Sequence, residues 1–266
     1  MRILWTALAV AVCPAVALAD DTPIMLRAYG WLSDVKGNVR ADDDGVSGSN
    51  LDIDRILNTE ENETAVGASL RFPLFWNLRL NADFWTEDFR GASTLTAPIN
   101  YGGSVFTAGT RVLSEFEFDV ATVTIEYDYM LPMSDDSAIG IAAMIGGRYI
   151  GFESTLKNTT ALVPFRETEK FSIFLPTTGL RAEVRLTQWF TAELSGQWFS
   201  AGDIEGRDVD TFEFQAGGTI NFWRGMYVGA GYRYIDFDIK DRSKSGQRLD
   251  LDMELDGAYF ELGYRF

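Results

Sequence analysis

Two stretches at the end of the chain decide the fold: MYVGAGYRYIDFDIKD at residues 226–241 and LDLDMELDGAYFELGYRF at residues 249–266. In both, apolar residues occupy every second position, and polar residues or glycine lie between them. A period of two is typical of β-strands, because successive side chains of a strand point to opposite faces. The sequence therefore predicts that these stretches form the two long strands of a hairpin.

The phase of this alternation changes halfway along each strand. Apolar residues fall at even-numbered positions over residues 226–234 and 258–266, and at odd-numbered positions over residues 235–239 and 251–255. One antiparallel register fits both phases, since it places Met226 opposite Tyr264, Val228 opposite Leu262, Ile235 opposite Leu255 and Ile239 opposite Leu251. Paired bulges would give the same change but require two coincidences. The simpler interpretation is a continuous hairpin whose apolar face changes sides.

A change of solvent along the strands explains the change of phase. Ala258 to Phe266 is nine residues, which span about 23 Å at about 3.3 Å per residue and a tilt of about 40°. This height matches the apolar band of about 25 Å that outer-membrane barrels present to lipid. In the lower half, where the chain ends, apolar side chains would face outward to lipid. In the upper half, carboxylates would face outward to water, and apolar side chains would turn inward.

The N-terminus has the pattern of a secretory signal peptide. Residues 1–19 combine Arg2, an apolar run and small residues before Asp20, as exported chains do. A membrane anchor is the poorer alternative because the apolar run is short. The single cysteine, Cys13, lies in this segment, so the mature chain has no disulfide. We expect residues 1–19 to be removed and residues 20–266 to form one domain.

The rest of the mature chain repeats the period of two. Its segments indicate ten strands, joined by alternating short and long connections, and three short turns carry Trp76, Trp189 and Trp223. Such a row of aromatic residues is expected at a membrane surface. A water-soluble sandwich would leave the lower apolar rows without a second sheet. The sequence therefore predicts an all-β fold: a single closed antiparallel transmembrane β-barrel of about ten strands, with short periplasmic turns, long extracellular loops and eight strands as the alternative.

The chain ends in a pattern that resembles a known assembly signal. Residues 260–266, FELGYRF, alternate and finish on an aromatic residue, which is similar to the C-terminal signal of outer-membrane β-barrel proteins, with Tyr264 and Phe266 at its aromatic positions. The mature chain also resembles the small OmpA-like and OmpW-like barrel families. The resemblance implies the outer membrane of a Gram-negative bacterium, with insertion by the barrel-assembly machinery. Outer-membrane lipid and lipopolysaccharide are the expected surroundings.

Charged residues of both signs fall on the inward face of the lower strands. Buried charges need partners, so we expect an ion-pair network that fills the interior. The chain has no histidine, the side chain that most often serves as a general base near neutral pH. A structural network is therefore favoured over catalysis by carboxylates alone, and we expect no enzyme activity, no metal and no cofactor. The predicted network consists of Arg148, Arg181, Glu183, Arg185, Glu193, Glu213, Arg233 and Glu261.

Ten apolar residues fall on the inward face of the upper strands. They are Phe116, Phe118, Ile150, Phe152, Phe171, Ile173, Ile235, Phe237, Leu251 and Met253. Burial of apolar surface is favourable by itself, at about 25 cal/mol per Å², so a dry core is the simpler interpretation. The alternative is a candidate pocket for a small hydrophobic ligand, which would need a cavity of several hundred Å³.

Charge and strand number limit the function. Removal of Arg2 leaves 22 basic and 39 acidic residues, a net charge of −17, which argues against a nucleic-acid partner. Side chains fill a barrel of about eight strands, whereas open porins have sixteen or more. We therefore predict a charge-plugged barrel with a structural or surface-interaction role. The alternative function is binding or transport of a small hydrophobic molecule.

Overall fold

The computed structural model describes residues 23–43, 46–59, 63–160, 165–204, 206–241 and 248–266. The predicted signal peptide, residues 1–19, lies outside the described residues. Within the described ranges, no helix has the length and apolar character needed to cross a membrane.

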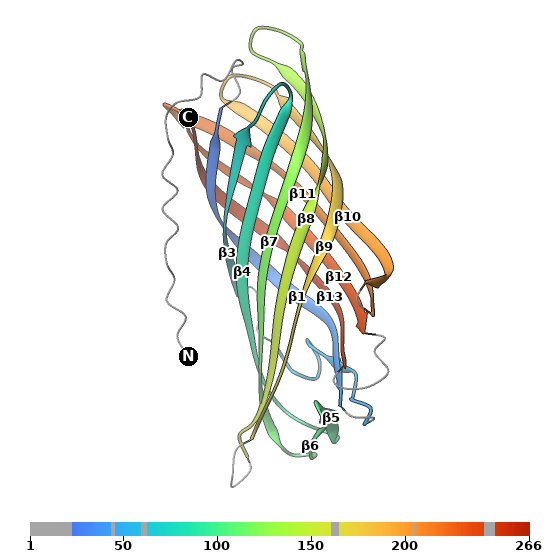
Figure 1. The fold of residues 1–266 in the computed structure, drawn as a ribbon. Coiled ribbons are helices and arrows are strands. Elements are labelled where there is room, and N and C mark those ends of the chain that lie inside the picture. The colour runs from blue at the N-terminus through green and yellow to red at the C-terminus, as the bar shows by residue number, and fades with distance from the viewer. Residues whose placement is uncertain (1–22, 44–45, 60–62, 161–164, 205, 242–247) are drawn as a thin grey trace.

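In the described part of the chain, ten long strands follow one another around a ring (Figure 1). Each strand pairs antiparallel with the next, and the last pairs with the first to close the ring. This confirms the predicted closed barrel and sets aside the alternative of eight strands. The strands are β1 (Met25–Asp42), β3 (Glu63–Pro73), β4 (Leu78–Thr94), β7 (Arg111–Pro132), β8 (Ala138–Asn158), β9 (Arg166–Arg185), β10 (Phe190–Ile204), β11 (Arg207–Trp223), β12 (Met226–Asp241) and β13 (Arg248–Arg265).

The closing hairpin, β12 and β13, has the predicted register. One ladder runs from Met226 opposite Tyr264 to Ile239 opposite Leu251. Side-chain burial changes sides along it as expected: Phe260 in the lower half is 59% exposed, whereas Leu255 in the upper half is fully buried. The same change occurs on β7, where Ile125 faces outward and Phe118 is fully buried.

The outer surface of the lower half is an apolar band with aromatic residues at its end. Exposed aliphatic side chains such as Ile145, Leu180 and Leu262 cover the band. Trp76 and Trp189 lie exposed in the short turns below it, and the exposed Trp223 is the last residue of β11. In water this surface would be unfavourable, so it fits the predicted contact with lipid.

The upper half is divided into two facing sheets. The ladder between β9 and β10 ends at Thr178 opposite Trp198, and the ladder between β3 and β4 ends at Val66 opposite Thr86. Pro176, which has no N–H to donate, lies just above the end of the β9–β10 ladder. Above these points the described residues of β4, β7, β8 and β9 form one sheet, and those of β10 to β13 and β1 form the other. The apolar core of the molecule lies between them.

A short hairpin and a turn cover the upper end of this core. The hairpin, β5 (Ile99–Tyr101) and β6 (Ser104–Phe106), lies at the end opposite the C-terminus. Figure 1 draws this upper end at the bottom of the picture. Tyr101 and Phe106 are fully buried, and the Tyr101 hydroxyl lies 2.5 Å from Ser154 Oγ on β8. The turn follows β2 (Leu51–Asp52) and buries Ile53.

Candidate functional site

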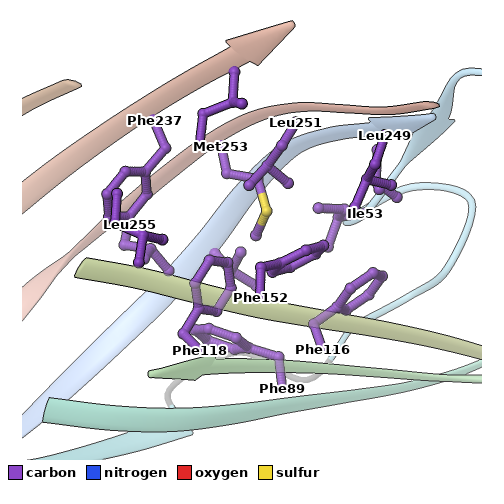
Figure 2. Packing of buried hydrophobic residues seen from close by; sticks show 14 of the residues in the cluster. Ile53, Phe89, Phe116, Phe118, Phe152, Phe237, Leu249, Leu251, Met253 and Leu255 are labelled. Carbon is purple, nitrogen blue, oxygen red and sulfur yellow. The ribbon is translucent and has the colours of Figure 1, made fainter. Parts of the chain in front are cut away.

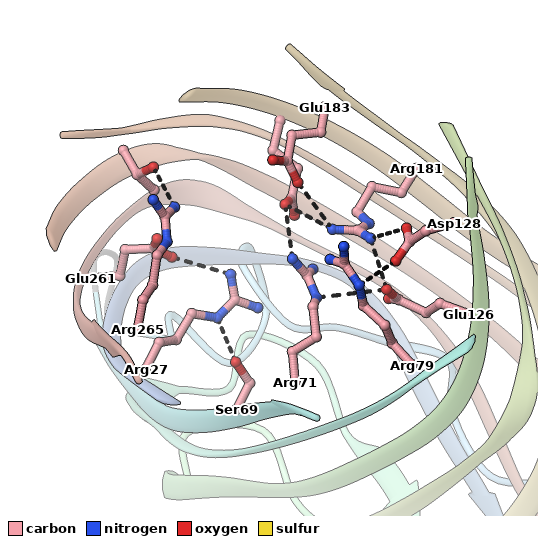
Figure 3. A network of polar contacts seen from close by, with 12 residues as sticks. Arg27, Ser69, Arg71, Arg79, Glu126, Asp128, Arg181, Glu183, Glu261 and Arg265 are labelled. Atoms are coloured by element: carbon pink, nitrogen blue, oxygen red, sulfur yellow. Dashed lines mark hydrogen bonds and ion pairs between the residues drawn. The ribbon is translucent and has the colours of Figure 1, made fainter. Parts of the chain in front are cut away.

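Arg181 is the centre of the ion pairs in the lower lumen, by which we mean the interior of the lower half. It points inward from β9, and its Nη2 atom lies 2.9 Å from Glu126 Oε2 and 2.6 Å from Asp128 Oδ1 on β7 (Figure 3). Its Nη1 atom lies 3.4 Å from both Glu183 and Glu193. Inward parity on three strands thus brings four carboxylates to one guanidinium, which compensates their burial.

Three more arginines extend the network around the barrel. Arg71 lies 3.6 Å from Glu126 and 3.4 Å from Glu193. Arg79 Nε lies 2.5 Å from Asp128 Oδ2. On β1, the strand next to β3, Arg27 donates a hydrogen bond to Glu261 at 3.1 Å and to Ser69 Oγ at 2.6 Å (Figure 3). The pair of Arg71 with Glu193 joins β3 to β10, which lie on opposite sides of the ring, so the network spans the lumen.

Arg233 on β12 marks the upper limit of the charged layer. Its Nη2 atom lies 2.7 Å from Glu213, which also pairs with Arg148. The face of the guanidinium lies 5.3 Å from the ring centre of Trp31 and 5.5 Å from that of Trp85. One side of Arg233 thus meets the ionic layer, and the other meets the first aromatic rings of the upper half.

The structure brings together seven of the eight residues proposed for the network. Arg148, Arg181, Glu183, Glu193, Glu213, Arg233 and Glu261 each have an ion-pair partner. Arg185 is a correction, because it is the exposed last residue of β9 and has no ion pair with any described residue. Asp83, absent from the proposed set, lies 3.5 Å from Arg233, and its inward parity on β4 was the available signal.

Two small cavities remain between the charged side chains. Their volumes are about 40 and 30 Å³, and Arg27, Arg71, Asn81 and Glu193 line both. Each has room for a few water molecules at most. Buried polar atoms with no protein partner, including Arg181 Nε and Glu126 Oε1, are suited to bind such water.

The ten residues proposed for an apolar pocket lie together in the upper core, the buried apolar cluster between the two upper sheets. Phe118 is in its middle: its ring centre lies 4.8 Å from Phe152 and 6.2 Å from Phe237, which comes from the opposite sheet (Figure 2). Nine of the ten are buried, and Phe171 on β9 is partly buried. These side chains pack against one another as a core does.

One buried carboxyl in this core escaped sequence reasoning. Glu87 on β4 is 2% exposed and accepts a hydrogen bond from the Ser33 hydroxyl on β1. Burial raises the pKa of Glu87 from 4.5 to about 8, and the Ser33 hydrogen bond and Arg233 oppose the rise. Its inward parity between Trp85 and Phe89 was the available signal. Among the described residues, no group of three or more carboxylates or cysteines could hold a metal ion.

Comparison with known proteins bears on the fold. No protein-family model matches the chain, and no curated protein matches it. The structure of the outer membrane protease OmpT from Escherichia coli is similar, with a TM-score of 0.53, 11% identity, and coverage of 95% of this chain and 99% of OmpT. The attachment invasion locus protein Ail of Yersinia pestis, solved with a heparin analogue, matches with a TM-score of 0.38, 10% identity and coverage of 92% and 99%. The toluene transporter TodX of Pseudomonas putida matches with a TM-score of 0.33, 8% identity and coverage of 93% and 91%.

At these identities the comparison extends to the fold alone. The chain has the fold of an outer-membrane β-barrel protein, as predicted. The predicted outer-membrane location agrees with this fold and with the apolar outer band. The narrower resemblance to OmpA-like and OmpW-like barrels stays a prediction.

Proposed function

We propose that the protein is an outer-membrane barrel with a charge-plugged lumen and a structural or surface-interaction role. The observation that carries the proposal is the ion-pair layer around Arg181, in which Glu193 on β10 contacts both Arg181 on the adjacent β9 and Arg71 on β3, at the opposite side of the ring. The two cavities beside it have the size of a few waters. Ions and sugars would have to break these pairs to pass.

Conductance of the reconstituted protein tests the plug. We expect planar bilayers with folded protein to show no current steps, and sugar-loaded liposomes to retain small sugars. The double variant Arg27→Ala and Arg71→Ala removes two side chains that line both cavities, so it should leak measurably more than the parent. Regular current steps from the parent would contradict a plugged lumen.

The further proposals concern chemistry and partners. We propose that the role is not enzymatic, because the chain lacks histidine and the inward carboxylates are engaged with arginines. Outer-membrane lipid, lipopolysaccharide and the barrel-assembly machinery are the proposed partners, with the exposed Phe266 as part of the assembly signal.

A second candidate function is binding of a small hydrophobic molecule in the upper core. The observation that favours it is the separation of β9 from β10 above Thr178, beside the partly buried Phe171 and Phe199. A fluorescent fatty acid should then bind saturably to the folded protein. Phe171→Trp should abolish binding, whereas Phe174→Trp, at an exposed position of the same strand, should not. Absence of binding to the parent would remove this candidate.

A further inference from the structure

Glu87 joins the two upper sheets at a place where their backbones do not pair. The β1–β3 ladder ends at Ser33 opposite Glu63, and the β3–β4 ladder ends three residues lower on β3, at Val66 opposite Thr86. At these ladder ends, the side-chain hydrogen bond from Ser33 to Glu87 connects β1 directly to β4. An outer groove of about 260 Å³, lined by Glu63, Thr86 and Glu87 among others, marks the same gap.

Only one of the two carboxyl oxygens of Glu87 has a hydrogen-bond partner among the described residues. Oε1 accepts the hydrogen bond from Ser33, whereas Oε2 is buried without a hydrogen-bond partner among the described residues. Two residues from Ser33 on β1 and from Glu87 on β4, the indole N–H groups of Trp31 and Trp85 are also buried without a hydrogen-bond partner in the described part of the chain. A buried ionised carboxylate needs compensation, but a protonated one is neutral and can itself donate a hydrogen bond.

The charged groups around Glu87 do not compensate an ionised form. Arg233 on β12 attracts it, while Glu63 on β3 and Asp88 on β4 repel it. Arg233 is already engaged with Glu213, Asp83 and the hydroxyl of Tyr29. Burial is the largest effect and places the pKa at about 8, so the side chain carries its proton at neutral pH.

We propose that Glu87 is a proton-binding site that latches β1 to β4 and closes the upper wall of the barrel. With the proton bound, a neutral carboxyl fits the apolar surroundings and keeps its contact with Ser33. When the proton leaves, a charge remains between aromatic rings and next to Glu63 and Asp88. The wall then opens at the end of the β3–β4 ladder, where water can reach the carboxylate.

Infrared spectroscopy and hydrogen exchange together test the latch. The folded parent at neutral pH should show the carbonyl band of a buried protonated carboxyl, and the band should vanish as the pH rises past the titration of Glu87. After correction for intrinsic rates, amide exchange on β4 above Thr86 should rise by up to about tenfold per pH unit from pH 4.5 to about 8 and level off above it, as proton linkage requires. Glu87→Gln, a neutral isostere, should lose the band and the pH dependence of exchange.

Two further variants separate the latch from general effects. Asp119→Asn removes an exposed carboxylate on β7 opposite Thr86 and should behave as the parent. Ser33→Ala should keep the band but speed exchange on β4 even at neutral pH. The proposal is overturned if the parent lacks the band below the titration range, or if Glu87→Gln keeps the parent's pH dependence. Should Glu87→Gln fail to fold, the parent's band and exchange, measured on one sample, decide alone.

Discussion

The lower lumen and the upper core are built from the same strands but have opposite interiors. On β7, Glu126 points into the lower lumen and contacts arginines, and Phe118 points into the upper core and contacts aromatic rings. The difference follows from the solvent outside. Where lipid surrounds the barrel, apolar residues are used on the outer face and the inner face is left to polar groups. Where water surrounds it, the ordinary arrangement of a globular core returns.

The largest expected effect comes from placing a lower-lumen residue in the upper core. Phe237→Arg introduces a charge at a fully buried position that packs against aromatic Phe118, which cannot serve as a counter-ion. We expect the folded state to be destabilised by several kcal/mol. We expect little folded protein and loss of protease resistance in the upper half. Asp236→Arg, at the outward-facing neighbour position on the same strand, is the control and should fold. Equal yields of the two variants would mean that the upper core tolerates charge.

The converse change removes charge from the lower lumen. Arg181→Met leaves Glu126 and Asp128 without their shared guanidinium contact, and loss of one buried partner destabilises by about 3–5 kcal/mol. Urea unfolding of the detergent-folded barrel measures the effect. Addition of Glu126→Gln should recover part of the loss, because it removes one of the stranded charges. A double variant as unstable as the sum of both single changes would show that the two residues are not coupled.

A smaller effect is expected on the pH dependence of the unfolding free energy, to which the buried Glu87 of the upper half contributes. The pKa of Glu87 is raised from 4.5 to about 8, so the folded protein holds a proton that the unfolded chain releases. This contribution is fully present below pH 4.5, falls as the pH rises to about 8 and is constant above it. Glu87→Gln should flatten this part of the profile in urea titrations, by at most a few kcal/mol at about 1.4 kcal/mol per pKa unit. An unchanged slope would assign the pH dependence to other groups.

The smallest expected effect on stability is at the chain end. Phe266 is 68% exposed and contacts Tyr264 at a ring distance of 4.7 Å, so its removal should change the unfolding free energy by about 0.5 kcal/mol or less. Assembly in cells should suffer more, with less folded barrel in the outer membrane and more unassembled chain in the periplasm. Heat-modifiable migration on gels reports the folded fraction. Full assembly without Phe266 would reduce the terminal pattern to an ordinary strand end.

The sequence predicted what depends on a single strand or on neighbouring strands. The period of two and its change of phase were sufficient for the register of β12 and β13, down to Ile235 opposite Leu255. They also predicted which side chains turn inward. Contacts across the interior depend on strand tilt and barrel diameter, so the pairs of Arg71 with Glu193 and of Arg233 with Asp83 were beyond reach.

Departures from a uniform barrel were missed for a related reason. The split above Thr178, the β5–β6 hairpin and the contact of Ser33 with Glu87 arise where ladders end. No periodic signal marks the end of a ladder when the strand itself continues. Pro176 was visible in the sequence, but a proline is compatible with many irregularities of a strand.

The length of β7 determines how far the protein reaches from the cell. Residues 111–120 lie above the lipid-facing part of this strand, and at about 3.3 Å per residue and a tilt of about 40° they rise about 25 Å. The β5–β6 hairpin is carried at that height. A molecule that approaches from outside therefore first meets a tip supported by β-sheet, about 25 Å above the lipid-facing part of the strand.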